Sequence, residues 1–420
     1  MKSIFDNKSR ALSLIFLGWL VYTVSYLGKV NYSANITQII DFYNVSKAQA
    51  GAVPTFFFFA YGIGQVVNGL FCKKYNIKWM IFTSLITSSI VNLIIAVSTN
   101  FAIIKWLWLL NGFALSILWP TLIRLISEAT PQKILGKSTI IMGTTVATGT
   151  LIIYGLSSLF AFLDCFKLSF YTASFSILTV ALIWLIFYNK IVSVAKKEKA
   201  EEKAVTETKT EKTTEQADKK ADGKIFFVSI YVLCFCAIGV NLIKDGLTTW
   251  VPSILKDEFS MSDSLSILLT LFLPILAVFG NAYAIKVHKK IPDYVNHCGV
   301  IFSVIAAMIL VIIGSLSVRL VIVMLLGLIA SNFFASSLNS LITGIYPLFM
   351  RGRVNSGLIA GVLNGFCYLG STISSYGLGA IADNFGWRAV FFVLLGFCGL
   401  ILIVWSGYHL YKRSVSKKTI

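Results

Sequence analysis

Long apolar stretches recur along the whole chain, and they constrain its fold more than any other feature. Because an α-helix needs about 20 apolar residues to cross the hydrocarbon of a bilayer, each stretch is long enough to span a membrane. The sequence predicts an all-α membrane protein with twelve transmembrane helices in two sets of six. These are residues 11–38, 49–72, 79–98, 101–128, 138–162, 168–190, 225–254, 263–286, 295–315, 318–346, 354–381 and 387–411.

The composition agrees with a membrane protein and excludes a soluble one. Of the 420 residues, 57% are hydrophobic and 13% are charged, whereas soluble domains carry about 25% charged residues. The formal net charge of +18 would suggest nucleic-acid binding in a soluble protein. Here the basic residues lie in short segments between apolar stretches, a pattern that orients membrane helices. The lipid bilayer is therefore the expected partner, and no nucleic acid is expected.

The two sets of helices predict two six-helix bundles joined by a charged segment. The N-terminal bundle is predicted over residues 1–190 and the C-terminal bundle over 225–420. The segment between them, 191–224, has no aromatic residue and mixes Lys with Glu and Thr. Such a composition does not bury enough apolar surface to order itself alone. It is interpreted as a solvated cytoplasmic linker, with a short charged helix as the alternative.

Lysine and arginine are unevenly distributed between the two sets of loops, which predicts sidedness. The connections after spans 2, 4, 8 and 10, the central segment and both chain ends carry most of these residues; the other loops carry few. Basic loops stay on the cytoplasmic side. We therefore expect a multi-pass protein of the plasma membrane with both termini in the cytoplasm.

The two sets of helices are weakly similar in sequence, as in carriers built from two repeats. In span 1, Lys29 precedes the segment Ile39–Ser46; in span 7, Lys244 precedes Ile254–Ser262 at nearly the same distance. The two halves are interpreted as parallel repeats. In span 11, Gly357, Gly361 and Gly365 recur every four residues, a spacing that favours close packing against a neighbouring helix.

Two lysines lie inside predicted spans, and the repeat places them at equivalent positions. Ionisable groups at membrane depth cost perhaps 2.5–3.5 kcal/mol on insertion scales and so suggest function. If the first helices of both halves face one central cavity, Lys29 and Lys244 make a site for an anion. The alternative is that each lysine reaches an interface or pairs with a carboxylate. Asp245 is adjacent to Lys244, but neighbouring helix residues do not face each other. Asp245 could still neutralise another cation, such as Lys29.

Further candidates lie near the lysines or at the cytoplasmic end of span 4. Tyr32 and Tyr61 could offer hydroxyl groups to a ligand, and Trp250 could offer an aromatic surface. Gln65 lies one turn after Tyr61 on the same face and could add amide hydrogen bonds. Arg124 and Glu128 are interpreted as a structural or gating ion pair rather than as substrate contacts.

Motifs for catalysis, nucleotides and metals are absent from the sequence. It contains no Walker-type loop and no nucleophile elbow, and its three histidines lie in or near predicted cytoplasmic connections without metal-ligand spacing. We therefore expect neither an enzyme nor a resident metal or cofactor, and transport that is not powered by ATP. A monomer is expected.

Several motifs resemble the major facilitator superfamily, and within it the organophosphate:phosphate antiporters, which include glycerol-phosphate and hexose-phosphate transporters. The segment YLGKVNY (Tyr26–Tyr32) is similar to their helix-1 motif Tyr-Leu-x-Arg-Lys-Asn-Phe. The segment KDGLTTWVP (Lys244–Pro252) is similar to their helix-7 motif Arg-x-Gly-x-x-x-Trp-x-Pro. The resemblance covers nearly the whole chain apart from the linker. It implies the major facilitator fold.

The resemblance also implies an anion site. The family binds phosphate with one arginine from each of helices 1 and 7, and these positions here are Lys29 and Lys244. Lysine binds phosphate as a point charge, without arginine's bidentate fork. Gln65 stands where these antiporters often have lysine.

Three functions are compatible with the sequence. The first is alternating-access transport of a small organic anion, a phosphate ester exchanged for phosphate, because an empty carrier would have to close around two unpaired cations. The second is proton-coupled symport of a carboxylate or sugar acid, with Asp245 or Glu128 taking the proton. The third is a membrane sensor that keeps the binding site and signals instead of transporting.

Overall fold

The computed structural model describes residues 9–71, 76–130, 132–206, 223–350 and 356–418. The described part is helical throughout its elements, with no strand. Helices in the first half are α1 (Ser9–Ala34), α2 (Ile36–Tyr43), α3 (Lys47–Phe71), α4 (Ile77–Val97), α5 (Phe101–Ser116), α6 (Leu118–Ala129), α7 (Gln132–Gly143), α8 (Thr145–Phe162) and α9 (Lys167–Thr206).

The second half begins with a long helix and ends with a longer one. Its elements are α10 (Gly223–Phe259), α11 (Asp263–Thr270), α12 (Phe272–Ala277), α13 (Gly280–His288), α14 (Tyr294–Ser317), α15 (Val321–Ser340), the π-helix η1 (Leu341–Ile345), α16 (Tyr346–Phe349) and α17 (Ser356–Lys418). The eighth span is broken into α11, α12 and α13 around Pro274, whose ring and missing N–H disrupt a helix.

The described residues contain twelve membrane crossings. Eleven helical stretches are long and apolar enough to span a membrane. The last of them, Ile359–Ser414, is interrupted at Gly386, where φ is +75°. Only glycine adopts this conformation without strain, and the break turns α17 into two crossings. The predicted fold class is therefore confirmed.

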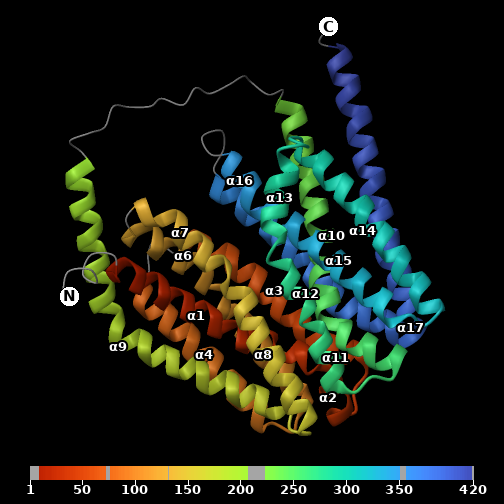
Figure 1. Ribbon diagram of the computed structural model, residues 1–420, viewed down its shortest axis with the longest axis horizontal. Coiled ribbons are helices and arrows are strands. Elements are labelled where there is room, and N and C mark those ends of the chain that lie inside the picture. The colour runs from red at the N-terminus through yellow and green to blue at the C-terminus, as the bar shows by residue number, and fades with distance from the viewer. Residues whose placement is uncertain (1–8, 72–75, 131, 207–222, 351–355, 419–420) are drawn as a thin grey trace.

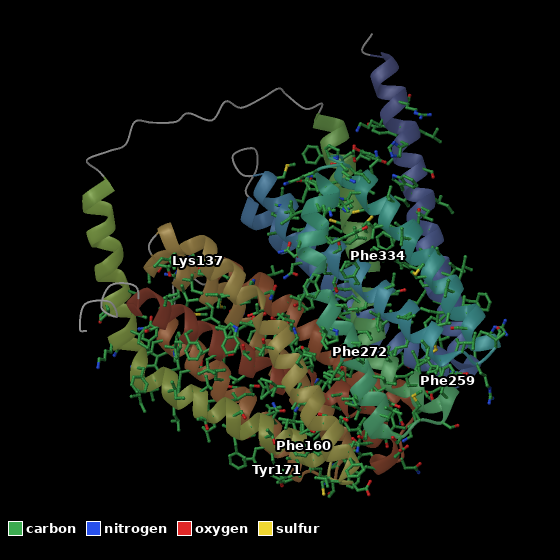
Figure 2. All side chains as sticks on the ribbon, in the orientation of Figure 1. Lys137, Phe160, Tyr171, Phe259, Phe272 and Phe334 are labelled. Carbon is green, nitrogen blue, oxygen red and sulfur yellow. The ribbon has the colours of Figure 1, made fainter. Side chains whose placement is uncertain are left out.

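The two halves of the chain lie side by side and meet along several helices (Figure 1). Helix α3 packs on α17, α8 packs on α11, and α2 packs on α10. Because twelve crossings return the chain to its starting side, Ser9 and Lys418 belong to one face, called here the terminal face; the opposite one is the distal face. The fifth crossing runs from Lys137 near the terminal face to Phe160 near the distal face (Figure 2).

Polar and apolar side chains are distributed as expected for a protein in lipid. Ile186 and Ile403 are each 68% exposed on the outside of the helices. By contrast, the amide side chains of Asn31, Asn92 and Asn111 are fully buried. An unsatisfied polar group costs several kcal/mol in hydrocarbon, so such groups are placed between helices where they find partners.

Two expectations about the helices need correction. Helix α9 continues to Thr206, sixteen residues past the predicted end of span 6, so the charged segment starts as a helix; residues 207–222 lie outside the described part. The predicted close packing at Gly361 and Gly365 is wrong, since a Cβ at either position would meet nothing within 4 Å. On α17 the close approach is at Gly370, against the backbone of Ile238 and Leu242 in α10.

Candidate functional site

A cavity of about 360 Å³ lies between the two halves, and both predicted lysines line it. Lys29 comes from α1 and Lys244 from α10, the first helix of each half. The cavity is also lined by residues of α8, α12, α13, α15 and α17. Its size suits a small solute rather than a macromolecule.

Lys29 is held among aromatic rings. Its Nζ lies 4.2 Å from the ring centre of Tyr61 and 4.9 Å from that of Tyr26. The rings of Phe57 and Tyr368 lie 5.7 Å away. Cations within about 6 Å of a ring centre are attracted by its quadrupole. Among the described residues, Lys29 forms no ion pair with a carboxylate, so these rings are its main partners.

A buried amide network fixes the turn of α1 that carries Lys29. The side-chain amide of Asn111 donates to the carbonyl of Gly28 at 2.8 Å. Asn31 donates to the side-chain oxygen of Asn92 at 2.8 Å, and Asn92 donates to the Ser88 carbonyl at 2.9 Å. These bonds link α1 to α4 and α5. They position the backbone next to Lys29 without using the lysine itself.

Lys244 has a carboxylate partner in Asp245, although these neighbouring helix residues were not expected to face each other. The Nζ of Lys244 lies 3.2 Å from Oδ1 of Asp245. Both side chains remain partly exposed, 24% and 18%, and both line the cavity. Neighbouring Cβ atoms diverge on a helix, but the long lysine side chain reaches back to the adjacent carboxylate. The premise of two unpaired cations in the empty site is therefore wrong.

The other predicted residues lie outside the cavity wall. Tyr32 is buried and its hydroxyl donates to the Ala50 carbonyl at 3.0 Å. Gln65 accepts a hydrogen bond from Asn364. Trp250 donates to the Ser375 carbonyl at 3.1 Å.

Tyr61 does not line the cavity, but its ring contacts two residues that do: the Lys29 ammonium and, at 4.8 Å, the ring of Tyr368. Arg124 Nε and Glu128 Oε1 lie 2.7 Å apart within one helix. This ion pair is also away from the cavity.

Several cavity residues were not singled out from the sequence. Amide side chains come from the second half: Asn281, Asn332 and Asn339. Asn332 donates to the Lys244 carbonyl at 3.1 Å. Asn339 precedes the π-helix η1, a type of distortion common at functional sites. In the sequence, these asparagines could have been recognised as polar residues inside predicted membrane spans.

Contacts between the halves close the distal side of the cavity. Lys256 of α10 bridges Asp41, at 2.6 Å, and Asp263, at 2.9 Å. Lys47 of α3 pairs with Asp257 at 3.2 Å. The carboxylate of Asp383 accepts hydrogen bonds from the first backbone amides of α3. In addition, Tyr154 of α8 donates to the Thr248 carbonyl at 3.2 Å, directly beside the cavity.

Close backbone approach completes this distal seal. A Cβ on Gly51 of α3 would overlap the carbonyl of Ser375 in α17 and press on the ring of Trp250. The Trp250 ring lies 5.7 Å from that of Trp387. Since both halves interlock here, the described conformation is closed on the distal side.

Two helical halves around a charged cavity are the architecture of multi-pass secondary transporters. The chain belongs to the Major Facilitator Superfamily, whose profile matches residues 18–357. Over 95 residues it is 27% identical to the membrane sensor protein UhpC of Escherichia coli, covering 23% of this chain and 22% of UhpC. Over 114 residues it is 24% identical to a probable hexose phosphate transport protein of Chlamydia pneumoniae, covering 27% and 24% of the two chains.

Solved structures of the same fold match almost the whole chain. A bacterial homologue of the human lysosomal transporter Spinster, inward-facing and occupied, gives a TM-score of 0.75 at 14% identity, covering 96% of this chain and 97% of that one. A D-xylose–proton symporter gives 0.73 at 13% identity, covering 95% and 97%. At such identities the match shows the fold alone.

Proposed function

We propose that the protein carries a small organic anion across the plasma membrane by alternating access, with phosphate esters and phosphate as its substrates in exchange. The observation that supports this most directly is the convergence of Lys29 and Lys244 on one cavity. Lysine ammonium groups bind phosphate as point charges. The amide and hydroxyl groups of Asn332, Asn339 and Thr248 supply hydrogen bonds for the rest of the solute.

The orientation is part of the proposal. The basic loops place both termini on the cytoplasmic side, so the distal face is the external one. The cavity is then closed to the outside and turned toward the cytoplasm. Alternating access would break the distal contacts and close the terminal side.

Exchange in proteoliposomes tests this function. Vesicles loaded with phosphate are given labelled glycerol phosphate, hexose phosphates or carboxylates, and uptake by wild type, Lys29→Ala and Lys244→Ala is compared. Phosphate-dependent uptake that either substitution abolishes is the expected result. Uptake that is indifferent to internal phosphate, or to both lysines, contradicts the proposal.

The ion pair in the cavity wall supports a second candidate. Asp245 is a carboxylate beside a cation at the site, the arrangement that a proton-coupled symporter of a carboxylate or sugar acid would use. Uptake of a labelled carboxylate driven by an inward proton gradient, without internal anion, would favour it. A third candidate, a sensor, predicts binding of the anion without flux.

A further inference from the structure

We propose that Asp245 is a counter-anion built into the chain, which takes the place of the transported anion at Lys244 whenever the cavity is empty. This inference rests on the proposed anion transport. It adds to that function that the empty carrier can reorient, so that the protein supports net anion flux as well as exchange. The carboxylate of Asp245 therefore decides between the two modes.

The carboxylate of Asp245 is held by a second helix, whereas the Lys244 ammonium is held by Asp245. The Oδ2 of Asp245 accepts a hydrogen bond from the Ser371 hydroxyl at 2.5 Å. Asn241 in turn donates to the Ser371 oxygen at 3.1 Å. The carboxylate is thus tied to α17, whereas the Lys244 ammonium has the Asp245 carboxylate as its ion-pair partner. An anion in the cavity therefore competes with Asp245 for the Lys244 ammonium.

The charges in the cavity explain why the empty site needs the carboxylate of Asp245. Lys29 and Lys244 contribute two positive charges and Asp245 one negative charge, a net +1 in the empty site. An uncompensated charge enclosed away from water is strongly unfavourable. With Asp245 in place, Lys244 stays compensated during the empty transition, and Lys29 remains among its four aromatic rings. When the anion binds Lys244, it supplies the compensation instead.

A purely structural role for Asp245 makes a different prediction. If the carboxylate only joined α10 to α17 through Ser371, its loss would slow every mode of transport alike. A counter-anion is needed only when the site is empty. The ratio of net flux to exchange therefore separates the two roles.

The test uses the purified full chain in liposomes loaded with labelled inorganic phosphate. Efflux is measured on the same vesicles in two ways: into buffer with phosphate, which reports exchange, and into buffer without transportable anion, which reports net flux. Asp245→Asn keeps the shape of the side chain and an oxygen for Ser371 but removes the charge. We expect it to lower net efflux at least tenfold while exchange stays within about twofold of wild type.

Two further variants serve as controls. Asp164→Asn removes an exposed carboxylate from the distal face, far from the cavity wall, and should leave both modes unchanged. Asp245→Glu keeps the negative charge beside Lys244. It should retain the wild-type ratio of net flux to exchange, because the Lys244 ammonium still has a carboxylate partner.

The outcomes are distinct. If Asp245→Asn slows both modes equally, or neither, the counter-anion role is wrong even though the protein is a phosphate carrier. If Asp245→Glu shows the same low ratio of net flux to exchange as Asp245→Asn, charge compensation is also wrong. If the wild-type protein moves neither phosphate nor its esters in either assay, the proposed function fails, and this inference fails with it.

Discussion

Asp383 of α17 caps the first turn of α3 in the other half: its Oδ2 accepts a hydrogen bond from the backbone amide of Ala48 at 2.7 Å. Its Oδ1 accepts one from the amide of Lys47 at 3.1 Å. The first amides of a helix have no partner within the helix. A carboxylate there also interacts favourably with the helix dipole. Here the cap comes from across the interface, so it exists only while the distal side is closed.

Removing this cap should open the distal side more often. Asp383→Ala loses a helix cap worth about 1 kcal/mol, or about a fivefold change in the closed-to-open ratio. The measurement is the labelling rate of Ser336→Cys, a cavity position, by an impermeant maleimide added at the distal face of an otherwise cysteine-free chain. We expect labelling to rise about fivefold. Glu258→Ala removes a carboxylate of α10 that forms no helix cap or ion pair within the described part of the chain. It should label like wild type, and equal labelling of both variants would contradict the role of Asp383.

Gly51→Ala should disturb the same seal by a steric route. The added methyl group would overlap the Ser375 carbonyl and the Trp250 ring, and overpacking of this kind costs about 1–3 kcal/mol. We expect faster distal labelling of the Ser336→Cys reporter than in wild type. Gly155→Ala is the matched control, since its methyl group would meet nothing within 4 Å. A rate that Gly51→Ala leaves unchanged would show that the halves do not approach this closely.

The aromatic rings around Lys29 should compete with a bound anion. Tyr368→Leu removes a ring 5.7 Å from the ammonium, a contact worth about 0.5–1 kcal/mol. If the anion draws Lys29 from the rings, phosphate binding should become about two- to fivefold tighter, measured by calorimetry on protein in detergent. Tyr368→Phe keeps the ring and should bind like wild type. Weaker binding in Tyr368→Leu alone would indicate that the ring holds the anion instead.

Asp293 lies outside the crossings, and its ion pair with Lys412 should give a pH-dependent contribution to stability. Partial burial acts to raise the pKa of Asp293, but hydrogen bonds from Lys412 and from the amides of Asn296 and Val295 hold that pKa below its ordinary 3.8. Because the folded-state pKa is the lower one, the contribution is present above pH 3.8 and is lost as the pH falls through the folded-state value.

Thermal unfolding in detergent checks this effect. Asp293→Asn should lower the melting temperature at pH 7, and the difference from wild type should shrink toward pH 3. Lys412→Met removes the partner at 2.6 Å. In that background, Asp293→Asn should lower the melting temperature at pH 7 by a smaller amount. A gap between wild type and Asp293→Asn that is constant with pH would exclude a titrating carboxylate as its source.

The fold could be predicted because long apolar stretches have few alternatives in a membrane. The helix ends could not: nothing in the apolar pattern stops α9 before Thr206, since Lys and Glu are good helix formers in water. The two site lysines were found because a charge inside an apolar span is conspicuous. The place of Asp245 in the cavity wall was not predicted, and its pairing with Lys244 depends on the bend of a flexible lysine side chain.

The tyrosines show where spacing alone stops being informative. Tyr26 and Tyr32 lie three residues on either side of Lys29, so both are compatible with its face of α1. Only the packing decides: Tyr32 lies against Trp108 at 5.6 Å, inside the first half, while Tyr26 lines the cavity. The amide wall of Asn281, Asn332 and Asn339 likewise depends on which helices meet, which a single sequence does not reveal.

The rings around Lys29 come from both halves, with Tyr368 on α17 and the other three on α1 and α3. The Lys29 ammonium therefore contacts rings from both halves of the protein. An anion that takes Lys29 away from Tyr368 removes one attraction between the halves in the same event. Binding of an anion in the cavity and weakening of the contact between the halves at Tyr368 then depend on the same side chain, Lys29.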